Sequence, residues 1–281
     1  MQRKAFAPLS KSVGRSSKES DQIMTKDQLQ TIRRHREGPV LRLTLDRPEV
    51  LNAINGTMLL EIRDALTEAA VDSDVRVILI DAAGDRAFSA GIDVAYVKDM
   101  HGVEAREVGR ELHRTFLALR TTEKPIVCSI DGLCLGAGLE LAVSCDFMVA
   151  TDRSSFGLPN IHRGIPAIVE AAILPLCVGI QGAREMAYLG EFWDAAKAER
   201  RGLIHTVVAP ADLEHEVNSL CARLADKSPA ALATQKEIIH KWMTTDLEAA
   251  IDFSINAVML NFMTRDQKEA MAAFLEKRRG K

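Results

Sequence analysis

The chain has 281 residues, and its 36 Lys and Arg against 39 Asp and Glu give a formal net charge of −3. Hydrophobic residues make up 47% of the sequence and charged residues 27%, as in a folded globular protein, which excludes a wholly disordered or fibrous chain. Because there is no basic excess and no apolar stretch long enough to cross a bilayer, we expect no nucleic-acid partner and no membrane insertion.

The N-terminal segment differs in composition from the rest of the chain. Residues 1–20 carry five basic side chains, a single acid and many serines, without a helical or strand period. We therefore expect a disordered arm over residues 1–30. A mitochondrial presequence, an expression tag, a natural arm or a misassigned start before Met24 would each explain this composition.

The five cysteines indicate the cellular compartment. Their number is odd, their surroundings are apolar and no CxxC pair occurs, which is typical of buried, reduced thiols. We therefore expect a cytoplasmic protein.

Strands and helices alternate after the arm. Residues 40–45 alternate apolar and polar side chains as a half-buried strand does, and Asn55 can cap a helix that runs to Val71. Residues 75–80 and 125–130 are short, β-branched, nearly continuous apolar runs, the pattern of strands buried on both faces. This order predicts an α/β fold with a parallel sheet and crossover helices.

From Pro210 onward the apolar periods are helical only. Helices are predicted over residues 213–224, 230–242, 247–263 and 266–278. The folded part of the chain therefore divides into an α/β core over residues 31–210 and a C-terminal helical region over residues 211–281.

Two glycine-containing loops come directly after predicted strands, where ligands bind in open α/β sheets. The first loop spans residues 88–93, and the second spans residues 132–138 and leads into an apolar helix. Either loop alone is adequately explained as a tight turn. Together they offer free backbone N–H groups that could converge on one oxygen and stabilise a developing enolate, so we expect an oxyanion hole.

Glu140 lies in the first turn of the helix that follows the second loop, within an otherwise apolar run. Burying a carboxylate there is costly unless it has a catalytic task or a partner. A carboxylate that merely interacts with the helix dipole is the other explanation, and the residue pattern does not decide between the two.

Four ordered motifs resemble those of one enzyme family. They are RPEVLNAIN at residues 47–55, AFSAGID at 87–93, DGLCLGAGLELAVSCDF at 131–147 and FGLP at 156–159. On these motifs and their spacing the chain resembles the enoyl-CoA hydratase/isomerase family, also called the crotonase family, over residues 38–278. The resemblance implies a crotonase-like spiral of ββα units with a C-terminal helical region, an acyl-CoA thioester substrate, and assembly into homotrimers or hexamers built as pairs of trimers. We expect no metal and no cofactor besides the coenzyme A of the substrate.

The resemblance also implies roles for individual residues. By position, the backbone N–H groups of Ala90 and Ala137 would hold the thioester oxygen, and Glu140 would handle the proton. Lys277 falls where a C-terminal lysine meets a CoA phosphate in relatives, although a solvated helix residue explains it as well. The segments that match the family's CoA pocket contribute Arg47, Leu51, Ala53, Phe88, Ile92 and Asp93.

The sequence departs from the family's pattern at residue 160. Hydratases of the family carry a second glutamate after the proline of this motif, and here Asn160 follows Pro159. An amide can orient water, but it cannot exchange a proton near neutral pH. We keep Asn160 among the candidate catalytic residues, and Glu170 or His162 could supply the missing proton-transfer group.

Several activities are compatible with this pattern. Hydration of a 2-enoyl-CoA is the leading hypothesis, and double-bond isomerisation or acyl-CoA decarboxylation would use the same enolate. The minor alternatives are a hydrolase using Cys134, whose surroundings resemble a nucleophile elbow, and a non-catalytic CoA-binding scaffold.

Overall fold

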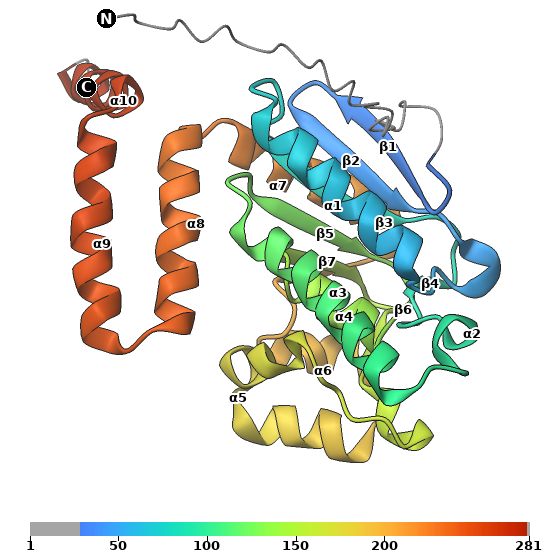
Figure 1. Cartoon of the computed structure of the whole chain (residues 1–281). Coiled ribbons are helices and arrows are strands. Elements are labelled where there is room, and N and C mark those ends of the chain that lie inside the picture. The colour runs from blue at the N-terminus through green and yellow to red at the C-terminus, as the bar shows by residue number, and fades with distance from the viewer. Residues whose placement is uncertain (1–28, 280–281) are drawn as a thin grey trace, which may run out of the picture.

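Two β-sheets form the centre of the molecule. The computed structural model describes residues 29–279 and is drawn in Figure 1. The larger sheet has the strand order β1-β2-β3-β5-β7-β10 and is parallel except for β1, and the smaller has the order β4-β6-β8-β9 and is parallel except for β9. The strands of the larger sheet are β1 (Ile32–Glu37), β2 (Val40–Leu45), β3 (Val77–Ala82), β5 (Ile126–Ile130), β7 (Phe147–Thr151) and β10 (Thr206–Val208). Those of the smaller sheet are β4 (Ala87–Ser89), β6 (Leu133–Leu135), β8 (Ser155–Gly157) and β9 (Trp193–Asp194).

The chain winds through the two sheets as a spiral. Each of the pairs β3–β4, β5–β6 and β7–β8 places one strand in the larger sheet and the next in the smaller one. Helices α2 and α3 follow the first pair and α4 follows the second, which confirms the predicted ββα spiral. The helices are α1 (Gly56–Val71), α2 (Val94–Val97), α3 (Gly102–Thr121), α4 (Ala137–Ala142), α5 (Leu174–Arg184), α6 (Ala195–Arg200), α7 (Leu213–Ala225), α8 (Pro229–Thr244), α9 (Leu247–Phe262) and α10 (Arg265–Arg279).

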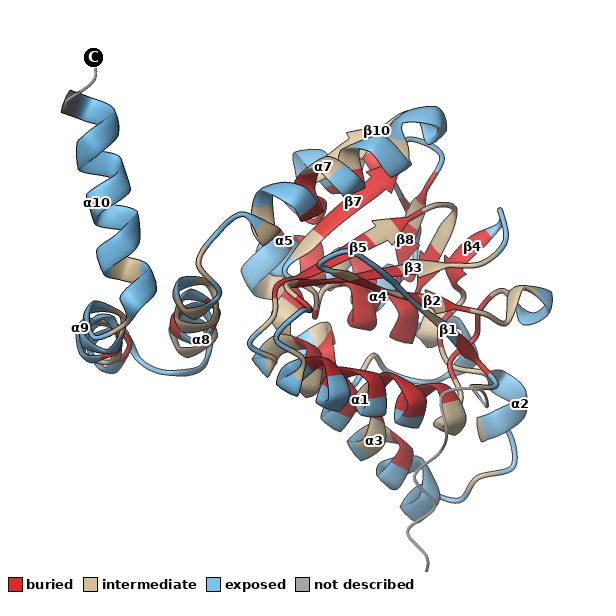
Figure 2. Ribbon diagram, turned by 90° about the horizontal axis from the view of Figure 1, so that it is seen from above, coloured by how far each residue is buried: buried red, intermediate tan, exposed pale blue. Residues whose placement is uncertain are grey.

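Helices cover both faces of the larger sheet, which explains its continuous apolar strands. On one face, Val77 and Leu79 of β3 pack with the apolar side of α7. On the other, Ile78 and Ile80 belong to the main core with α1 and α3, and these buried surfaces are red in Figure 2. Helix α7, which follows residue 210, thus packs directly on the sheet.

Helix α1 is capped as predicted. Asn55 Oδ1 accepts a hydrogen bond from Met58 N–H at 2.9 Å, and the helix ends at Val71. Glu61 of the same helix is buried and accepts the N–H of Gln30 at 2.7 Å, which fixes the start of the described chain. The predicted arm lies outside the described residues, apart from its last two.

Sequence periodicity does not indicate α3, β1 or the smaller sheet. The strands of that sheet have two or three residues each, which is too short for an alternation of side chains to be recognised. After Pro166 the backbone stays irregular to Val169, and a 3-10 turn over Glu170–Ile173 precedes α5. Pro175 lies in the first turn of α5, where a residue without an N–H is tolerated.

The C-terminal helices α8, α9 and α10 match the predicted ranges. Figures 1 and 2 place α9 and α10 away from the two sheets, with α9 packed against α8. The apolar side chains of α9 are therefore largely exposed, among them Leu247, Ile251, Ile255, Val258, Met259, Leu260 and Phe262. Within residues 29–279 there is no helix of the length and apolarity needed to span a membrane.

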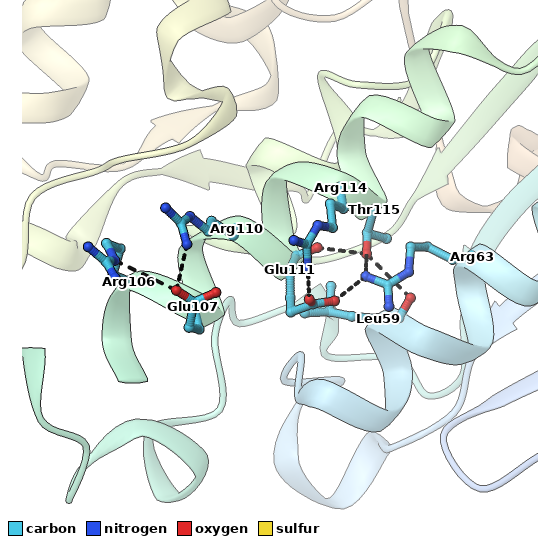
Figure 3. A network of polar contacts seen from close by, with 8 residues as sticks. All are labelled: Leu59, Arg63, Arg106, Glu107, Arg110, Glu111, Arg114 and Thr115. Atoms are coloured by element: carbon cyan, nitrogen blue, oxygen red, sulfur yellow. Dashed lines mark hydrogen bonds and ion pairs between the residues drawn. The ribbon is translucent and has the colours of Figure 1, made fainter. Parts of the chain in front are cut away.

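Polar contacts fix α3 against α1, as Figure 3 shows. Arg63 of α1 forms an ion pair with Glu111 of α3, and Glu111 also pairs with Arg114. Thr115 is buried between the helices and donates a hydrogen bond to the Leu59 carbonyl at 3.3 Å. Helix α3 is thus held against α1 along one side. Two of its other side chains, His113 and Arg120, contact Glu170 at the candidate site.

Candidate active site

Three parallel strands of the smaller sheet end at the same edge, and a predicted motif follows each of them. Strand β4 pairs with β6, and β6 pairs with β8, all in parallel. The loops at residues 90–93, 136–140 and 158–160 therefore lie next to one another. The convergence expected from the order of the motifs is present in the fold.

The first two loops approach each other so closely that glycine is required at their contact. Gly91 has a φ of +98°, and a Cβ on it would lie 2.9 Å from the Leu135 carbonyl oxygen and 3.3 Å from Ala137 N. A Cβ on Gly138 would lie 2.6 Å from the Ser89 Cβ. Both glycines therefore serve the close packing of these loops rather than a turn alone.

The backbone N–H that the first loop leaves free is not the predicted one. Ala90 N–H donates to the Leu51 carbonyl at 2.9 Å, so it is already engaged. Ile92 forms a parallel bridge with Ile54, in which Ile54 N–H donates to Gly91 and Asp93 N–H donates to Ile54. In this bridge the Ile92 N–H points away from Ile54, and it has no hydrogen-bond partner among residues 29–279. The structure thus corrects the donor from Ala90 to Ile92.

The second loop presents the predicted donor. Ala137 is the first residue of α4, so its N–H lacks an intrahelical acceptor, and none is found elsewhere in the described chain. Gly136 precedes it with a φ of 52° and donates its own N–H to the Gly157 carbonyl at 2.9 Å. The turn into α4 is therefore fixed by β8 while the Ala137 N–H stays free.

Glu140 is buried on α4, with only 3% of its surface exposed. Its Oε2 accepts the N–H of Glu170 at 3.0 Å. Burial raises the pKa of Glu140 to about 7 and the charge of Glu170 adds to this, while N–H groups of residues 169–171 act in the opposite direction. Such a carboxyl can hold or release a proton near neutral pH.

Asn160 lies beside the second loop. It belongs to a short 3-10 turn, Pro159–Arg163, that follows β8. A Cβ on Gly136 would lie 3.1 Å from its Oδ1, so the amide borders the residue that precedes the free Ala137 N–H. Of the four predicted catalytic residues, the structure brings Glu140, Ala137 and Asn160 together, and the backbone of Ala90 adjoins them.

The two alternative proton-transfer residues have other partners in the structure. The carboxylate of Glu170 is bound by Arg120 at 2.9 Å and lies 3.0 Å from Nδ1 of His113, both on α3. The His162 ring lies at the surface, with Nε2 3.3 Å from the Gly190 carbonyl oxygen, which is a structural contact.

Cys134 does not have the surroundings of a nucleophile. Its side chain is fully buried in the main core, and burial raises the pKa of its thiol well above the ordinary value. The thiolate needed for attack is therefore strongly disfavoured.

Some of the predicted CoA residues brace one turn, and the others lie elsewhere in the structure. Arg47 pairs with Asp93 at 2.9 Å and donates to the Ala53 carbonyl at 2.6 Å, so these residues brace one turn, to which Leu51 also belongs. Together with residues 83–87, this turn lines a pocket of about 270 Å³.

Phe88 is fully buried in the main core, which corrects its assignment to a ligand pocket. Lys277 is exposed on α10, and Figure 1 places that helix away from this turn.

The arrangement combines two unpartnered N–H groups with one carboxyl that titrates near neutral pH. Unpartnered N–H groups can stabilise negative charge on an oxygen, and the carboxyl can move a proton beside it. Within the described residues, no group of three or more His, Cys, Asp or Glu side chains could hold a metal ion.

The sequence gives no sign of Arg120, and the predicted donor of the first loop, Ala90, is not the residue whose N–H is free. Arg120 lies 50 positions before Glu170, and no local pattern marks the pairing. The Ile92 N–H depends on a bridge to Ile54 that only the folded chain reveals.

The chain is similar to known proteins along nearly its whole described length. The Enoyl-CoA hydratase/isomerase family matches residues 35–281. A crotonyl-CoA hydratase from Syntrophomonas wolfei is 37% identical over 238 residues, covering 84% of this chain and 92% of that protein. A short-chain-enoyl-CoA hydratase from Clostridium acetobutylicum is 34% identical over 245 residues, covering 87% and 94%. The structure of enoyl-CoA hydratase subunit I from Geobacillus kaustophilus aligns with a TM-score of 0.84 at 34% identity, covering 89% of this chain and 96% of that one. The structure of DspI from Pseudomonas aeruginosa aligns with a TM-score of 0.86 at 27% identity, covering 91% and 97%.

Proposed function

The chain belongs to the enoyl-CoA hydratase/isomerase family and is an enzyme of that family, and from this premise we propose that it hydrates 2-enoyl-CoA thioesters. The observation that carries the proposal is the buried Glu140, with a pKa of about 7, beside two loops that leave the N–H groups of Ile92 and Ala137 free. The names of the two bacterial relatives favour a short acyl chain, so crotonyl-CoA is the substrate to test first.

The thioester oxygen would accept hydrogen bonds from the N–H groups of Ile92 and Ala137. Glu140, in its ionised form, takes a proton from water while the water oxygen bonds to C3 and the C2=C3 electron pair moves into the enolate. The enolate charge is stabilised by the two N–H groups because they are fixed in place before the reaction. Glu140 then delivers its proton to C2, so one water molecule is added in full and the carboxylate is regenerated.

Asn160 favours one alternative within the family. Its amide can hold the water but cannot carry a proton, so a single carboxyl must perform both transfers. Moving a double bond needs only one group that takes a proton from one carbon and returns it to another, which suits isomerisation of an enoyl-CoA.

Coenzyme A would lie along the turn over residues 47–53. The pocket of about 270 Å³ there is lined by Pro48, Glu49, Leu51 and Asn52 from the turn and by residues 83–87. The braced backbone of the turn, together with Ile92 and Asp93, would position the thioester at the free N–H groups.

The function is tested by following crotonyl-CoA hydration with the wild-type chain, Glu140→Gln and Asn160→Glu. We expect hydration by the wild type and a loss of about 100-fold or more in kcat for Glu140→Gln. A rise in hydration with Asn160→Glu would mean that the missing second carboxyl limits the rate. Conversion of a 3-enoyl-CoA without hydration of crotonyl-CoA would replace the hydratase proposal by the isomerase.

We further propose that the chain assembles with itself as a trimer or a pair of trimers. The support is the exposed apolar surface of α9, where Ile255 is 64% exposed and Phe262 is 58% exposed. Apolar surface of this extent on a helix that packs on one side only is typical of a protein interface.

A further inference from the structure

Glu170 connects two parts of the molecule through different atoms. Its backbone N–H donates to Glu140 Oε2 at 3.0 Å, and its side chain is only 2% exposed. Its Oε1 accepts a hydrogen bond from Arg120 at 2.9 Å and lies 3.0 Å from His113 Nδ1. Its Oε2 is buried and has no hydrogen-bond partner among the described residues. The ion pair with Arg120 is therefore the main compensation for burying this carboxylate.

Apart from the apolar packing of Val169 and Ala171 on the main core, the ion pair with Arg120 is the contact that ties the segment holding Glu140 to α3. The segment runs from Val169, whose φ of −111° and ψ of −103° are not those of a helix or a strand, into the 3-10 turn that starts at Glu170. The turn has no side-chain cap. Helix α3, by contrast, is fixed against α1 through Arg63, Glu111 and Thr115 (Figure 3).

The charged and titratable groups around this segment come mostly from three helices. Glu140 comes from α4, and Arg120 and His113 come from α3. Arg120 also lines a pocket with Glu123 and with Lys236, Glu237, His240 and Lys241 of α8, and Lys236 is paired with Asp146 at 2.7 Å. Arg120 is the arginine that forms the ion pair with the Glu170 carboxylate.

We propose that Arg120 and Glu170 form a positioning pair for Glu140, in which α3 anchors the turn at residue 170 so that its backbone N–H holds the Glu140 carboxylate in place. The inference rests on the proposed function, which gives Glu140 its proton-transfer role. Neither Arg120 nor the Glu170 side chain contacts the reacting atoms.

The pair also acts on Glu140 through charge. The Glu170 carboxylate disfavours the ionised form of Glu140 and raises its pKa, and Arg120 limits that effect by balancing the Glu170 charge. Removing either partner should therefore change the titration of Glu140, and in different ways. A pair with a purely structural role would change the stability of the fold but would not shift the pKa of Glu140 differently in the two variants.

The test is a carboxyl-carbon NMR titration of ¹³C-glutamate-labelled protein, with Glu140 identified by its absence in Glu140→Gln. In Glu170→Gln the negative charge is removed while the N–H remains, so we expect the Glu140 pKa to fall by about one pH unit. In Arg120→Met the charge of Glu170 is no longer balanced, so we expect the Glu140 pKa to rise above the wild-type value. Arg120→Lys keeps the positive charge and should leave the Glu140 pKa close to that of the wild type.

Arg114→Met is the matched control, because Arg114 lies on the same helix and pairs with Glu111 instead of Glu170. It should leave the titration unchanged. In turnover, Arg120→Met should lower kcat about tenfold with KM within about twofold, since it displaces Glu140 and not the CoA contacts.

An unchanged Glu140 pKa in Glu170→Gln, or a titration in Arg120→Met identical to that of Arg114→Met, overturns the proposal. If Arg120→Met does not fold, Glu170→Gln and Arg120→Lys still decide the question. The titration needs no substrate, so it tests the pair even if hydration of crotonyl-CoA is not observed.

Discussion

A carboxyl that is nearly completely buried lies at the centre of the proposed site. Glu140 is flanked by apolar neighbours on α4 and meets polar groups at the turn over residues 169–171. The sequence marks it as unusual, because a carboxylate in an apolar run is costly. It does not reveal that N–H groups of a distant turn hold the carboxylate, so that Glu140 has partners other than the helix dipole.

The raised pKa of Glu140 predicts a pH-dependent stability. The folded state binds the proton more tightly than the unfolded state, so the stabilisation is present below the ordinary glutamate pKa and is lost as pH rises to about 7. Between about pH 5.5 and about pH 8, this group should lower the free energy of unfolding by about 2 kcal/mol. Urea unfolding of wild type and Glu140→Gln at fixed protein concentration measures it. Equal pH dependence in the two proteins would contradict the assignment.

Ile92 and Ala90 illustrate the limit of prediction at this scale. The family motif points to the loop, and the loop contains the successive N–H groups of Ala90, Gly91 and Ile92. Which of them is free depends on the bridge between Ile54 and Ile92, which pairs residues 38 positions apart. A one-dimensional motif therefore locates the site but not the donor atom.

At the scale of elements, the site is produced by the parallel pairing of β4, β6 and β8. Their carboxyl ends meet at one edge, so three short loops are brought together without any long insertion. The glycines at the contact between the loops are the positions where this arrangement is least tolerant of change.

Substitution of Gly91 tests the contact between the two loops. In Gly91→Ala the new Cβ would meet the Leu135 carbonyl at 2.9 Å and Ala137 N at 3.3 Å, so the loops must move apart. We expect a stability cost of about 1–3 kcal/mol and at least a tenfold loss in kcat/KM. Gly38→Ala is the control, since Gly38 also has a positive φ of +57° but no neighbour within 4 Å. It should cost about 1 kcal/mol and leave kcat/KM unchanged. Equal kinetic effects of the two variants would argue against a tight contact.

At the scale of the whole molecule, helices cover both faces of the larger sheet, whereas the apolar side chains of the C-terminal helix α9 are largely exposed. Helix α9 packs against α8 and leaves most of its apolar side chains exposed. Figures 1 and 2 show α9 and α10 on the side of α8 that faces away from the sheets. A second copy of the chain is the partner that accounts for this surface in the proposed assembly.

Charge placed on the exposed face of α9 should disrupt that assembly. The double variant Ile255→Lys, Met259→Lys introduces two ammonium groups where apolar contact is expected, and burying them without partners is costly. Sedimentation should give a lower molecular mass than the wild type at equal concentration. Glu248→Lys, on the same helix at a position that is already charged, is the control and should leave the mass unchanged. A monomeric wild type would refute the assembly itself.

The sequence alone determined the family, the alternation of strands and helices and the helical C-terminal region, and it marked Glu140 and Asn160 as candidate site residues. Each depends on residues close together in the chain, namely apolar periods, the Asn55 cap and motifs of fewer than 20 residues. The tertiary structure decided that Ile92 carries the free N–H, that Phe88 is a core residue, that α7 packs on the sheet and that Arg120 pairs with Glu170. These facts depend on contacts between distant segments, which follow from the way the spiral closes and leave no local pattern in the sequence.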